Sequence, residues 1–345
     1  MSPTFQFAIS VPSAVSSLAF LTPDSLCAGS DNGTARVYDL PSPKVVRAIK
    51  SLGSEISTAV TVQNTAEEDS LVWFASGRRA LLFAVKSPQL ILSEEDAMSI
   101  LELGEDDEDV LNELCLSDNG KYMAFASDAG SVGVVELSTK RISRMKSRHD
   151  SICGAVKFVP NRPSELVSGG YDSAVLHFDF SQGTLLSRYD ITAPLPSSGV
   201  SLSLPFVLST AITSAGLFAA STADGRVWLG GGGEKRASQS GNKKRSRKWE
   251  GLKDDEGLWL QVAEGPVVAI MFSGVETLIT CSLLGTISGY HISRDSDSKL
   301  KAGKFWSAGS KGIAKVNSLS ISGQWLAVGG LVTDGKGIIE IWCMN

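Results

Sequence analysis

Three residues that lie close together in the sequence have the side chains of a nucleophilic triad: His149, Ser168 and Asp172. A histidine held between a serine and an aspartate can deprotonate the serine for attack, but geometry defines a triad and residue types alone do not. The same three types can form a buried hydrogen-bond network. The sequence contains none of the motifs GxGxxG, GxxxxGK[ST], GxSxG or HExxH. We therefore predict that the set is structural and that the protein is not an enzyme.

Residues that could hold a metal or a cofactor are scattered along the chain. No CxxC pair is present, and the three histidines lie in different regions. An acidic run at 102–109 could bind calcium, but its spacing differs from an EF-hand loop, so a solvated connection is the preferred interpretation. The dispersed cysteines suit small buried apolar side chains; they are Cys27, Cys115, Cys153, Cys281 and Cys343. No metal and no cofactor is expected.

Basic residues are concentrated in one segment. Residues 235–248 hold seven lysines and arginines and no acid; the whole chain carries −5, so the remainder carries −12 (−5 less +7). The surrounding stretch, residues 230–257, is rich in Gly and Ser and is predicted to be a flexible loop insert. The basic run has the form of a nuclear-import signal or a nucleic-acid tether, and a merely solvated loop is the alternative. Its residues are Lys243, Lys244, Arg245, Arg247 and Lys248.

A repeated pattern of short strands must position these residues. Residues 14–40 (AVSSLAFLTPDSLCAGSDNGTARVYDL) contain an apolar strand, a turn, a strand ending in small residues, an Asn-Gly turn and an alternating strand. Asn32-Gly33 predicts a tight hairpin in which both residues have positive φ. The pattern recurs along the chain, and the ends of the third strands align at Tyr38, Phe83, Val135, Phe178, Gly230, Tyr290 and Trp342.

The spacing of these seven positions is close to the period of roughly 40–45 residues of WD40 repeats, lengthened by loops. We infer an all-β fold, a seven-bladed WD40 β-propeller that occupies residues 1–345 as a single domain. The last repeat ends on its third strand at Trp342, and residues 4–10 (TFQFAIS) form a strand outside any repeat. We expect this N-terminal strand to complete the last blade, because the pairing removes a free edge and closes the ring.

Two local features complete the predicted elements. Phe5 and Phe7 alternate with polar residues, which predicts that both point to one buried face of the N-terminal strand. Helix is almost absent from the pattern. Residues 93–101 (SEEDAMSIL) alone look briefly helical, with Ser93 as a cap.

Residues 109–180 carry the most specific likeness to a known family. The stretch RHDSICGAVKFVPNRPSELVSGGYDSAVLHFDF, with DEDVLNELCLSDNGKYMAFASDAGSVGVVELSTKR before it, resembles the WD-repeat protein 53 family. The resemblance implies that His149, Ser168 and Asp172 form the buried hydrogen-bond network that fixes a WD40 blade. It also implies a substrate receptor of a cullin-4 ubiquitin ligase, which docks the ligase adaptor through aromatic-Asp-x-Arg endings. The ending Tyr38-Asp39-Leu40-Pro41 lacks the Arg, and the other repeats depart from the motif as well.

These features predict a non-enzymatic scaffold or adaptor that binds proteins or peptides. A cullin-4 substrate receptor is the more specific form of that function, and a nuclear factor that contacts RNA, chromatin or preribosomes through the basic loop is the alternative. The acidic body argues against more than nonspecific nucleic-acid binding. Without a leader or a long apolar stretch, we expect a nuclear or cytoplasmic protein, neither secreted nor membrane-bound. We also expect a monomeric propeller that works within larger complexes.

Overall fold

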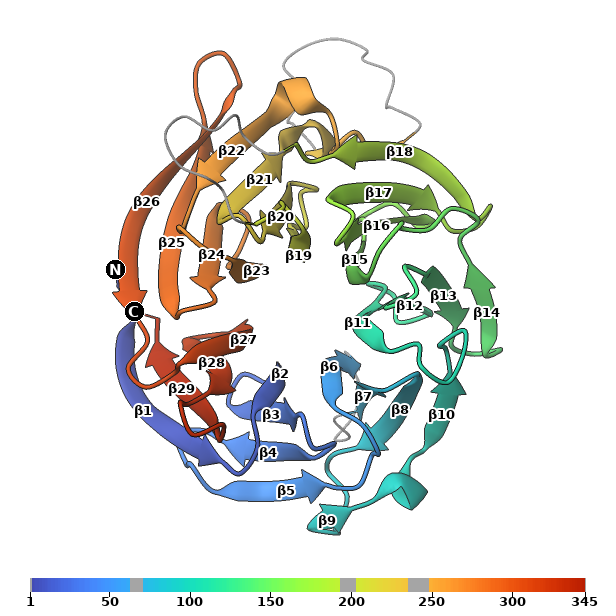
Figure 1. The fold of residues 1–345 in the computed structure, drawn as a ribbon, viewed down its shortest axis with the longest axis vertical. Coiled ribbons are helices and arrows are strands. Elements are labelled where there is room, and N and C mark those ends of the chain that lie inside the picture. Colours follow the sequence, from blue (N-terminus) through green and yellow to red (C-terminus); the bar gives the residue numbers. More distant parts are fainter. Residues whose placement is uncertain (1, 63–70, 193–202, 235–247, 345) are drawn as a thin grey trace.

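Seven small antiparallel sheets follow one another around a central opening (Figure 1). This arrangement is seen in a computed structural model that describes residues 2–62, 71–192, 203–234 and 248–344. The apolar core lies between neighbouring sheets; one cluster, for example, combines Ala124 and Val134 of the third sheet with Leu166 and Phe178 of the fourth. The predicted seven-bladed β-propeller is confirmed.

Each blade has its first strand beside the channel and its last strand at the rim. Blade 1 contains β2 (Val15–Thr22), β3 (Ser25–Ser30), β4 (Ala35–Asp39) and β5 (Val45–Ile49), and blade 2 contains β6 (Ile56–Val62), β7 (Leu71–Ser76), β8 (Arg79–Ala84) and β10 (Ser99–Glu102). Blade 3 contains β11 (Leu111–Leu116), β12 (Tyr122–Ser127), β13 (Val132–Glu136) and β14 (Arg141–Arg144), and blade 4 contains β15 (Cys153–Phe158), β16 (Glu165–Gly170), β17 (Ala174–Asp179) and β18 (Thr184–Asp190). Blade 5 contains β19 (Val207–Ile212), β20 (Phe218–Thr222), β21 (Arg226–Gly230) and β22 (Gly257–Gln261), and blade 6 contains β23 (Val267–Phe272), β24 (Thr277–Ser282), β25 (Thr286–Arg294) and β26 (Leu300–Gly309). Blade 7 contains β27 (Lys315–Ser322), β28 (Trp325–Leu331) and β29 (Gly337–Cys343), with β1 (Thr4–Val11) as its outer strand.

The alignment of the seven third strands is correct in register. In every blade the aligned residue of the third strand pairs with the same position of the second strand. The pairs are Leu26–Tyr38, Val72–Phe83, Met123–Val135, Leu166–Phe178, Phe218–Gly230, Leu278–Tyr290 and Leu326–Trp342. The repeat pattern in the sequence therefore located one structural position seven times, including blade 5, where Gly230 replaces the usual large residue.

The N-terminal strand closes the ring, as predicted. β1 pairs antiparallel with β29 of blade 7, from Thr4 opposite Cys343 to Val11 opposite Gly337. A bulge between Phe5 and Phe7 changes the expected alternation, because Phe5 pairs with Trp342 while Phe7 pairs with the next residue along. Phe5 therefore packs on the side of blade 6 and Phe7 on the side of blade 1. The prediction that both phenylalanines share one face is wrong for this reason.

The hairpin turn of the first repeat also differs in detail. Gly33 has a φ of 69°, but Asn32 is not among the residues with positive φ. The amide of Gly33 donates to the carbonyl of Ser30, and the amide of Ser30 donates to the carbonyl of Thr34. The loop between Ser30 and Thr34 therefore has three residues. A three-residue hairpin loop needs a single left-handed residue at its end, which Gly supplies at no steric cost.

Residues 85–98 join the third and outer strands of blade 2 by a detour onto blade 1. β9 (Ile91–Leu92) pairs in parallel with β5 and adds a fifth strand to that blade. A 3-10 turn η1 (Glu94–Asp96) follows, and the Asp96 carboxylate accepts the amide of Ser93 at 2.8 Å. The helix predicted over 93–101 is therefore a single turn. It ends at Asp96, and residues 99–101 belong instead to β10, which pairs with β8, so tertiary pairing outweighs the weak helical preference there.

Candidate interaction surfaces and the buried networks beneath them

His149, Ser168 and Asp172 come together in blade 4. The His149 ring lies between the other two, with Nδ1 2.8 Å from Asp172 Oδ1 and Nε2 2.8 Å from Ser168 Oγ. His149 lies in the connection between β14 and β15, Ser168 in β16, and Asp172 in the turn after it. Asp172 also accepts the amides of Asp150 and Ala174. The network thus joins a connection, a strand and a turn of one blade.

The order of atoms in this network is that of a catalytic triad, but its serine is enclosed. Ser168 is 0% exposed and His149 2%, so a substrate cannot reach the hydroxyl group. Burial by itself would raise the pKa of Asp172, but the hydrogen bonds from His149 and the two amides outweigh it and lower the pKa. A carboxylate held ionised beside a buried histidine suits a role in fixing the blade, which stays a prediction.

A second buried histidine forms a network that the sequence did not reveal. His177 of β17 has Nε2 2.9 Å from Glu165 Oε2 and Nδ1 3.1 Å from Ser187 Oγ. The same Glu165 oxygen accepts the backbone amide of Trp249 at 2.9 Å. Burial would raise the pKa of Glu165, but the bonds from His177 and Trp249 outweigh it and lower the pKa. Blade 4 therefore holds the far end of the insert in blade 5.

Trp249 is the anchor of that insert. Its side chain is 2% exposed, its Nε1 donates to the carbonyl of Gly216 at 3.0 Å, and its ring lies 5.8 Å from Phe218. A Cβ added at Gly233 would lie 1.7 Å from the indole nitrogen, so glycine is needed there to let the backbone pass the ring. A flexible loop throughout 230–257 is therefore the wrong interpretation for its two ends, where the structure shows η2 (Gly231–Gly233), η3 (Asp254–Glu256) and a buried tryptophan.

The basic run is represented in the structure by its last residue. Lys248 has an exposed side chain whose Nζ donates to the carbonyl of Leu186, and its own carbonyl accepts Arg162 Nη2 at 3.2 Å. The other members of the predicted set lie outside the described residues: Lys243, Lys244, Arg245 and Arg247. A role in nuclear import therefore stays a prediction.

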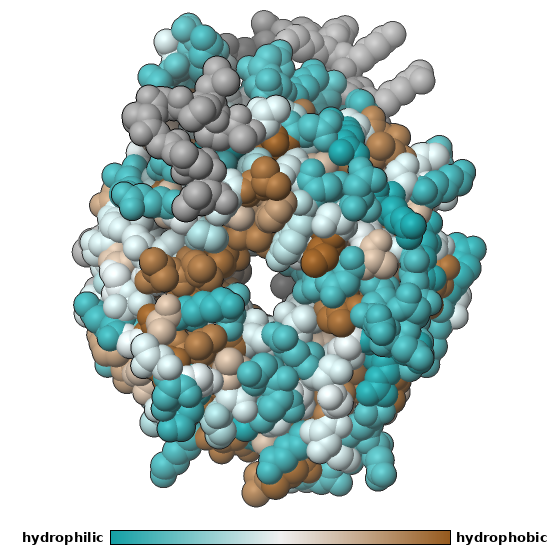
Figure 2. Space-filling view, in the orientation of Figure 1, coloured by the Kyte–Doolittle hydropathy of each residue, from teal (hydrophilic) through white to brown (hydrophobic). Residues whose placement is uncertain are grey.

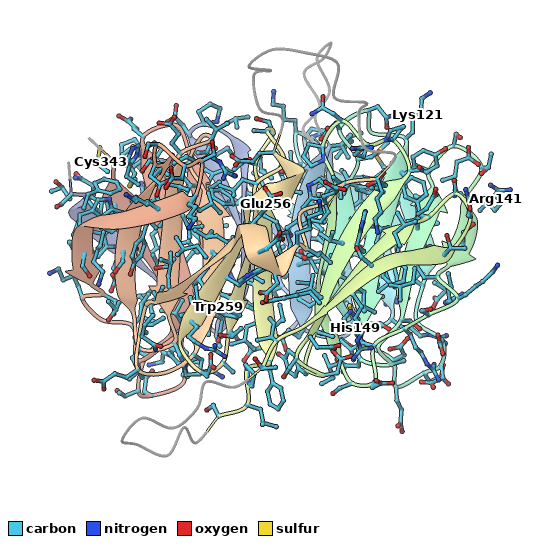
Figure 3. The ribbon with its side chains drawn as sticks, turned by 90° about the horizontal axis from the view of Figure 1, so that it is seen from above. Lys121, Arg141, His149, Glu256, Trp259 and Cys343 are labelled. Atoms are coloured by element: carbon cyan, nitrogen blue, oxygen red, sulfur yellow. The ribbon has the colours of Figure 1, made fainter. Side chains whose placement is uncertain are left out.

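The propeller has two faces with different elements. The top face is formed by the turns between second and third strands and by the connections between blades, and the bottom face by the remaining turns. Figure 3 shows the difference, with His149 toward one face and Lys121 and Cys343 toward the other. Figure 2, which looks onto the top face, shows the central opening and hydrophobic side chains beside it, over the region of β24 and β28.

Apolar groups on the top face include two of the most exposed large side chains among the described residues. Leu284, in the β24–β25 turn, is 78% exposed, and Leu204, in the connection before β19, is 62% exposed. Nearby in the chain, the ring of Phe206 is stacked on Tyr171 with centroids 5.6 Å apart. The adjoining channel has a volume of about 590 Å³ and is lined by first strands, with the ion pair of Lys157 and Glu113 in its wall. The exposed leucines suit the binding of a partner protein on the top face, where apolar anchors are surrounded by polar groups.

The acidic run at 102–109 is more ordered than a solvated connection requires. It joins blades 2 and 3 on the top face, as predicted, but Asp109 is buried. Its carboxylate accepts the amide of Glu105 at 2.8 Å and that of Ala129 at 2.9 Å. Among the described residues there is no group of three or more His, Cys, Asp or Glu placed to hold a metal ion.

The aromatic-Asp endings lie at the bottom ends of the third strands. Asp39 is exposed next to the buried Tyr38. Asp179 follows the buried Phe178, and its carboxylate accepts the amide and hydroxyl groups of Ser181 at 2.9 and 2.6 Å. In both blades the position where the family motif has Arg is occupied by another residue, so the aspartates lack that neighbour.

The thiols give no sign of reactive chemistry. All five cysteines are free, and burial raises the pKa of Cys27 and Cys281 to about 12. Burial also raises the pKa of Cys115 and Cys153, so these groups stay protonated at neutral pH. In the part of the chain that the structure describes, no helix has the length and apolar character of a membrane span.

Comparison with known proteins agrees with this architecture. Residues 5–39 match the family model described as WD domain, G-beta repeat. Over 165 residues the chain is 24% identical to the WD repeat-containing protein 53 homolog of Dictyostelium discoideum, a stretch that is 47% of this chain and 42% of that protein. The match thus spans less than half the length of that relative. The chain is thus a seven-bladed β-propeller in which one segment matches the WD40 repeat, and it is similar over about half of its length to WD repeat-containing protein 53.

Proposed function

We propose that the protein is a scaffold that binds a peptide or loop of partner proteins across its top face. WD40 propellers are typically non-enzymatic interaction scaffolds, and nothing in the described residues indicates catalysis. The observation that carries the proposal is the exposure of Leu284 and Leu204 on the top face. Exposed apolar side chains with polar surroundings are typical of binding surfaces, whose central anchors contribute most of the affinity.

The test compares substitutions at two exposed apolar residues of blade 6, one in a turn on the top face and one in a turn on the bottom face. Leu284→Asp on the top face should remove most partners recovered with the tagged protein, without lowering its melting temperature. Val275→Asp is the matched control, because Val275 is 47% exposed but lies in the β23–β24 turn on the bottom face. If both variants keep the same partners as the wild type, the top-face proposal is wrong.

A more specific form of this function is a substrate receptor of a cullin-4 ubiquitin ligase. It is favoured by the similarity to WD repeat-containing protein 53 and by the retained endings Tyr38-Asp39 and Phe178-Asp179. In this proposal the adaptor subunit of the ligase docks on the bottom face near Asp39 and Asp179, which leaves the top face for the substrate.

This form predicts binding of the purified adaptor subunit that is lost in an Asp39→Ala/Asp179→Ala variant. The Leu284→Asp variant should bind the adaptor as the wild type does. Absence of adaptor binding by the wild-type protein would remove the ligase role and leave the scaffold proposal standing.

The alternative is a nuclear factor that uses the basic segment. It is motivated by the run of basic residues that ends at Lys248, where the chain is anchored on blade 4. Replacing Lys243, Lys244, Arg245, Arg247 and Lys248 with Gln should move a tagged protein from the nucleus to the cytoplasm. If the scaffold proposal is right, binding of the wild type to RNA or DNA should be weak and should fall steeply with salt, because phosphate contacts alone are salt-sensitive. Tight, salt-resistant RNA binding that the substitutions abolish would favour the nuclear factor over the scaffold.

A further inference from the structure

The wall of the channel differs between one group of blades and the rest. Each first strand has a bulge near its start, and the bulged residue lines the channel. In four blades its side chain donates to a backbone carbonyl of the next blade: Ser16 to Ile56, Ser57 to Leu111, Asn112 to Cys153 and Asn317 to Val15. In blades 4, 5 and 6 the bulged residue has no donor side chain; these residues are Gly154, Leu208 and Val268.

Gly154 leaves a free place between blades 4 and 5. The first strands of these blades, β15 and β19, are neighbours at the channel (Figure 1). A Cβ atom at position 154 would lie 3.2 Å from Cε1 of Tyr171 and 3.6 Å from the carbonyl oxygen of Val207. A longer side chain would stand against the tyrosine ring, so glycine leaves this edge of the ring uncovered.

Tyr171 is one of two stacked aromatic residues at this place. It lies in the β16–β17 turn on the top face, and Phe206 lies in the connection just before β19. The two rings are nearly parallel, with an interplanar angle of 10° and centroids 5.6 Å apart, and both side chains are only half-buried. The faces and edges of such a pair offer an apolar platform, and the faces also attract cations.

A carboxylate is held next to the aromatic pair. Asn112 donates to Oδ1 of Asp128 at 2.9 Å and to the carbonyl of Cys153, the residue before Gly154, at 3.1 Å. Burial raises the pKa of Tyr171, and the charge of Asp128 raises it further, as expected of a carboxylate near the phenol group. Asp128 is exposed and forms no ion pair with a described residue. Its charge is therefore open to a ligand.

The combination of aromatic rings and a carboxylate selects for a cation. A lysine or arginine side chain has an apolar stem that packs on aromatic rings and a charged end that bonds to a carboxylate. An acidic or a neutral group would gain nothing from the carboxylate. The chain outside residues 235–248 is strongly acidic, which favours the approach of a positively charged segment.

We propose that Asp128, Gly154, Tyr171 and Phe206, the seam site, bind one lysine or arginine side chain of a partner protein. The stem of that side chain lies against Tyr171 and Phe206 beside Gly154, and its charged end pairs with Asp128. This inference rests on the proposed scaffold function, to which it adds the chemistry of the partner segment.

An array of random short peptides, probed with the full chain, tests the charge preference. Peptides bound by the wild type should be enriched in lysine and arginine. Asp128→Asn should weaken their binding about tenfold, and Asp128→Lys should change the preference to aspartate and glutamate. Asp31→Asn is the matched control, because Asp31 is exposed at the corresponding position of blade 1, where Glu55 takes the place of Phe206. It should leave the preference unchanged. Binding without enrichment in basic residues, or enrichment that survives Asp128→Asn, would overturn the proposal.

Gly154→Ser tests whether the free place is used. The substitution supplies the side chain that Ser16 and Ser57 have in their blades, so it should block basic peptides without lowering the melting temperature. Tyr171→Phe keeps the ring and should bind these peptides as the wild type does, whereas Tyr171→Ala should bind them about tenfold more weakly. Basic peptides that bind equally well to Gly154→Ser and to Tyr171→Ala would show that they do not occupy the seam site.

The same peptides separate this proposal from the scaffold function on which it rests. If Leu284→Asp loses its partners but the wild type shows no preference for basic peptides, the seam site is wrong and the top-face scaffold stands. If basic peptides bind through Asp128 while Leu284→Asp keeps all partners, the seam site stands and the leucine anchor is wrong.

Discussion

Two places in this propeller join segments that are far apart in the sequence, and they are built differently. At the ring closure, β1 joins β29 through a ladder of backbone hydrogen bonds that extends from Thr4 to Val11. At the insert junction, Trp249 joins blade 4 through its amide on Glu165 and its buried ring beside His177, while its indole nitrogen bonds to Gly216 of blade 5. The closure depends mainly on backbone groups, whereas the junction depends on one large side chain and one buried carboxylate.

This difference explains why the ring closure can be predicted from the sequence and the insert junction cannot. A backbone ladder needs only strands of matching length and alternation, which leave a periodic pattern. A side-chain junction needs particular partners, and those partners can lie anywhere; Glu165 and Trp249 are 84 positions apart. The comparison predicts that the closure is essential to the whole ring, while the junction stabilises one side of it.

Deleting residues 1–10 should have the largest effect. The deletion removes the half-buried side chains of Phe5 and Phe7 and the buried side chain of Ile9, and it exposes the edge of β29. The ring then loses its closure, and the unpaired strand edge becomes open to aggregation. We expect a sharply lower melting temperature and aggregation on heating, measured by circular dichroism and light scattering. Deleting residues 1–3, which precede β1, is the control and should leave the transition unchanged. A normal melting curve for the longer deletion would contradict this role of the closure.

Trp249→Ala should have the next largest effect. It leaves a cavity beside Phe218 and removes the indole bond to Gly216, so the loss of unfolding free energy should be about 3–5 kcal/mol in urea denaturation. Trp249→Phe keeps most of the packing and loses the hydrogen bond, so it should cost only about 1 kcal/mol. Equal and negligible losses for both variants would show that the junction is not a stabilising element.

Asp172→Ala tests the network that lies within one repeat. The substitution leaves His149 and two amides without their acceptor, and we expect a loss of about 1–3 kcal/mol in unfolding free energy. Asp172→Asn keeps the shape and some of the bonds and should cost less. Loss of partner binding at unaltered stability would instead assign Asp172 to a functional site.

Acidification should weaken both blade-4 networks, with the smallest effect of the four. The folded-state pKa values of Asp172 and Glu165 are lowered, so their stabilisation is complete above the ordinary values of 3.8 and 4.5 and is lost as pH falls through the lower folded values. The melting temperature of Asp172→Asn/Glu165→Gln should lie below that of the wild type at neutral pH, and the gap should narrow as the pH falls below these values. A difference in melting temperature that stays constant down to the pH of acid unfolding would show that ionisation of these two carboxylates does not stabilise the fold.

The sequence alone determined the features that recur with the repeat. It located one position in each of seven blades, because the pairing of second and third strands repeats the same short-range pattern around the ring. It also identified the closing strand and gathered His149, Ser168 and Asp172 into one blade, since all three lie within one repeat unit. These are consequences of local spacing and strand alternation, which a chain carries in its order of residues.

Tertiary structure alone decided the features that break the repeat. The bulge that separates Phe5 from Phe7 depends on the match between β1 and β29. The burial of Trp249 depends on a space beside Phe218 and on an acceptor in blade 4, and the detour of β9 depends on a free edge in blade 1. Each of these has a local sequence compatible with several conformations, and the choice among them is made by contacts between segments that the repeat does not relate.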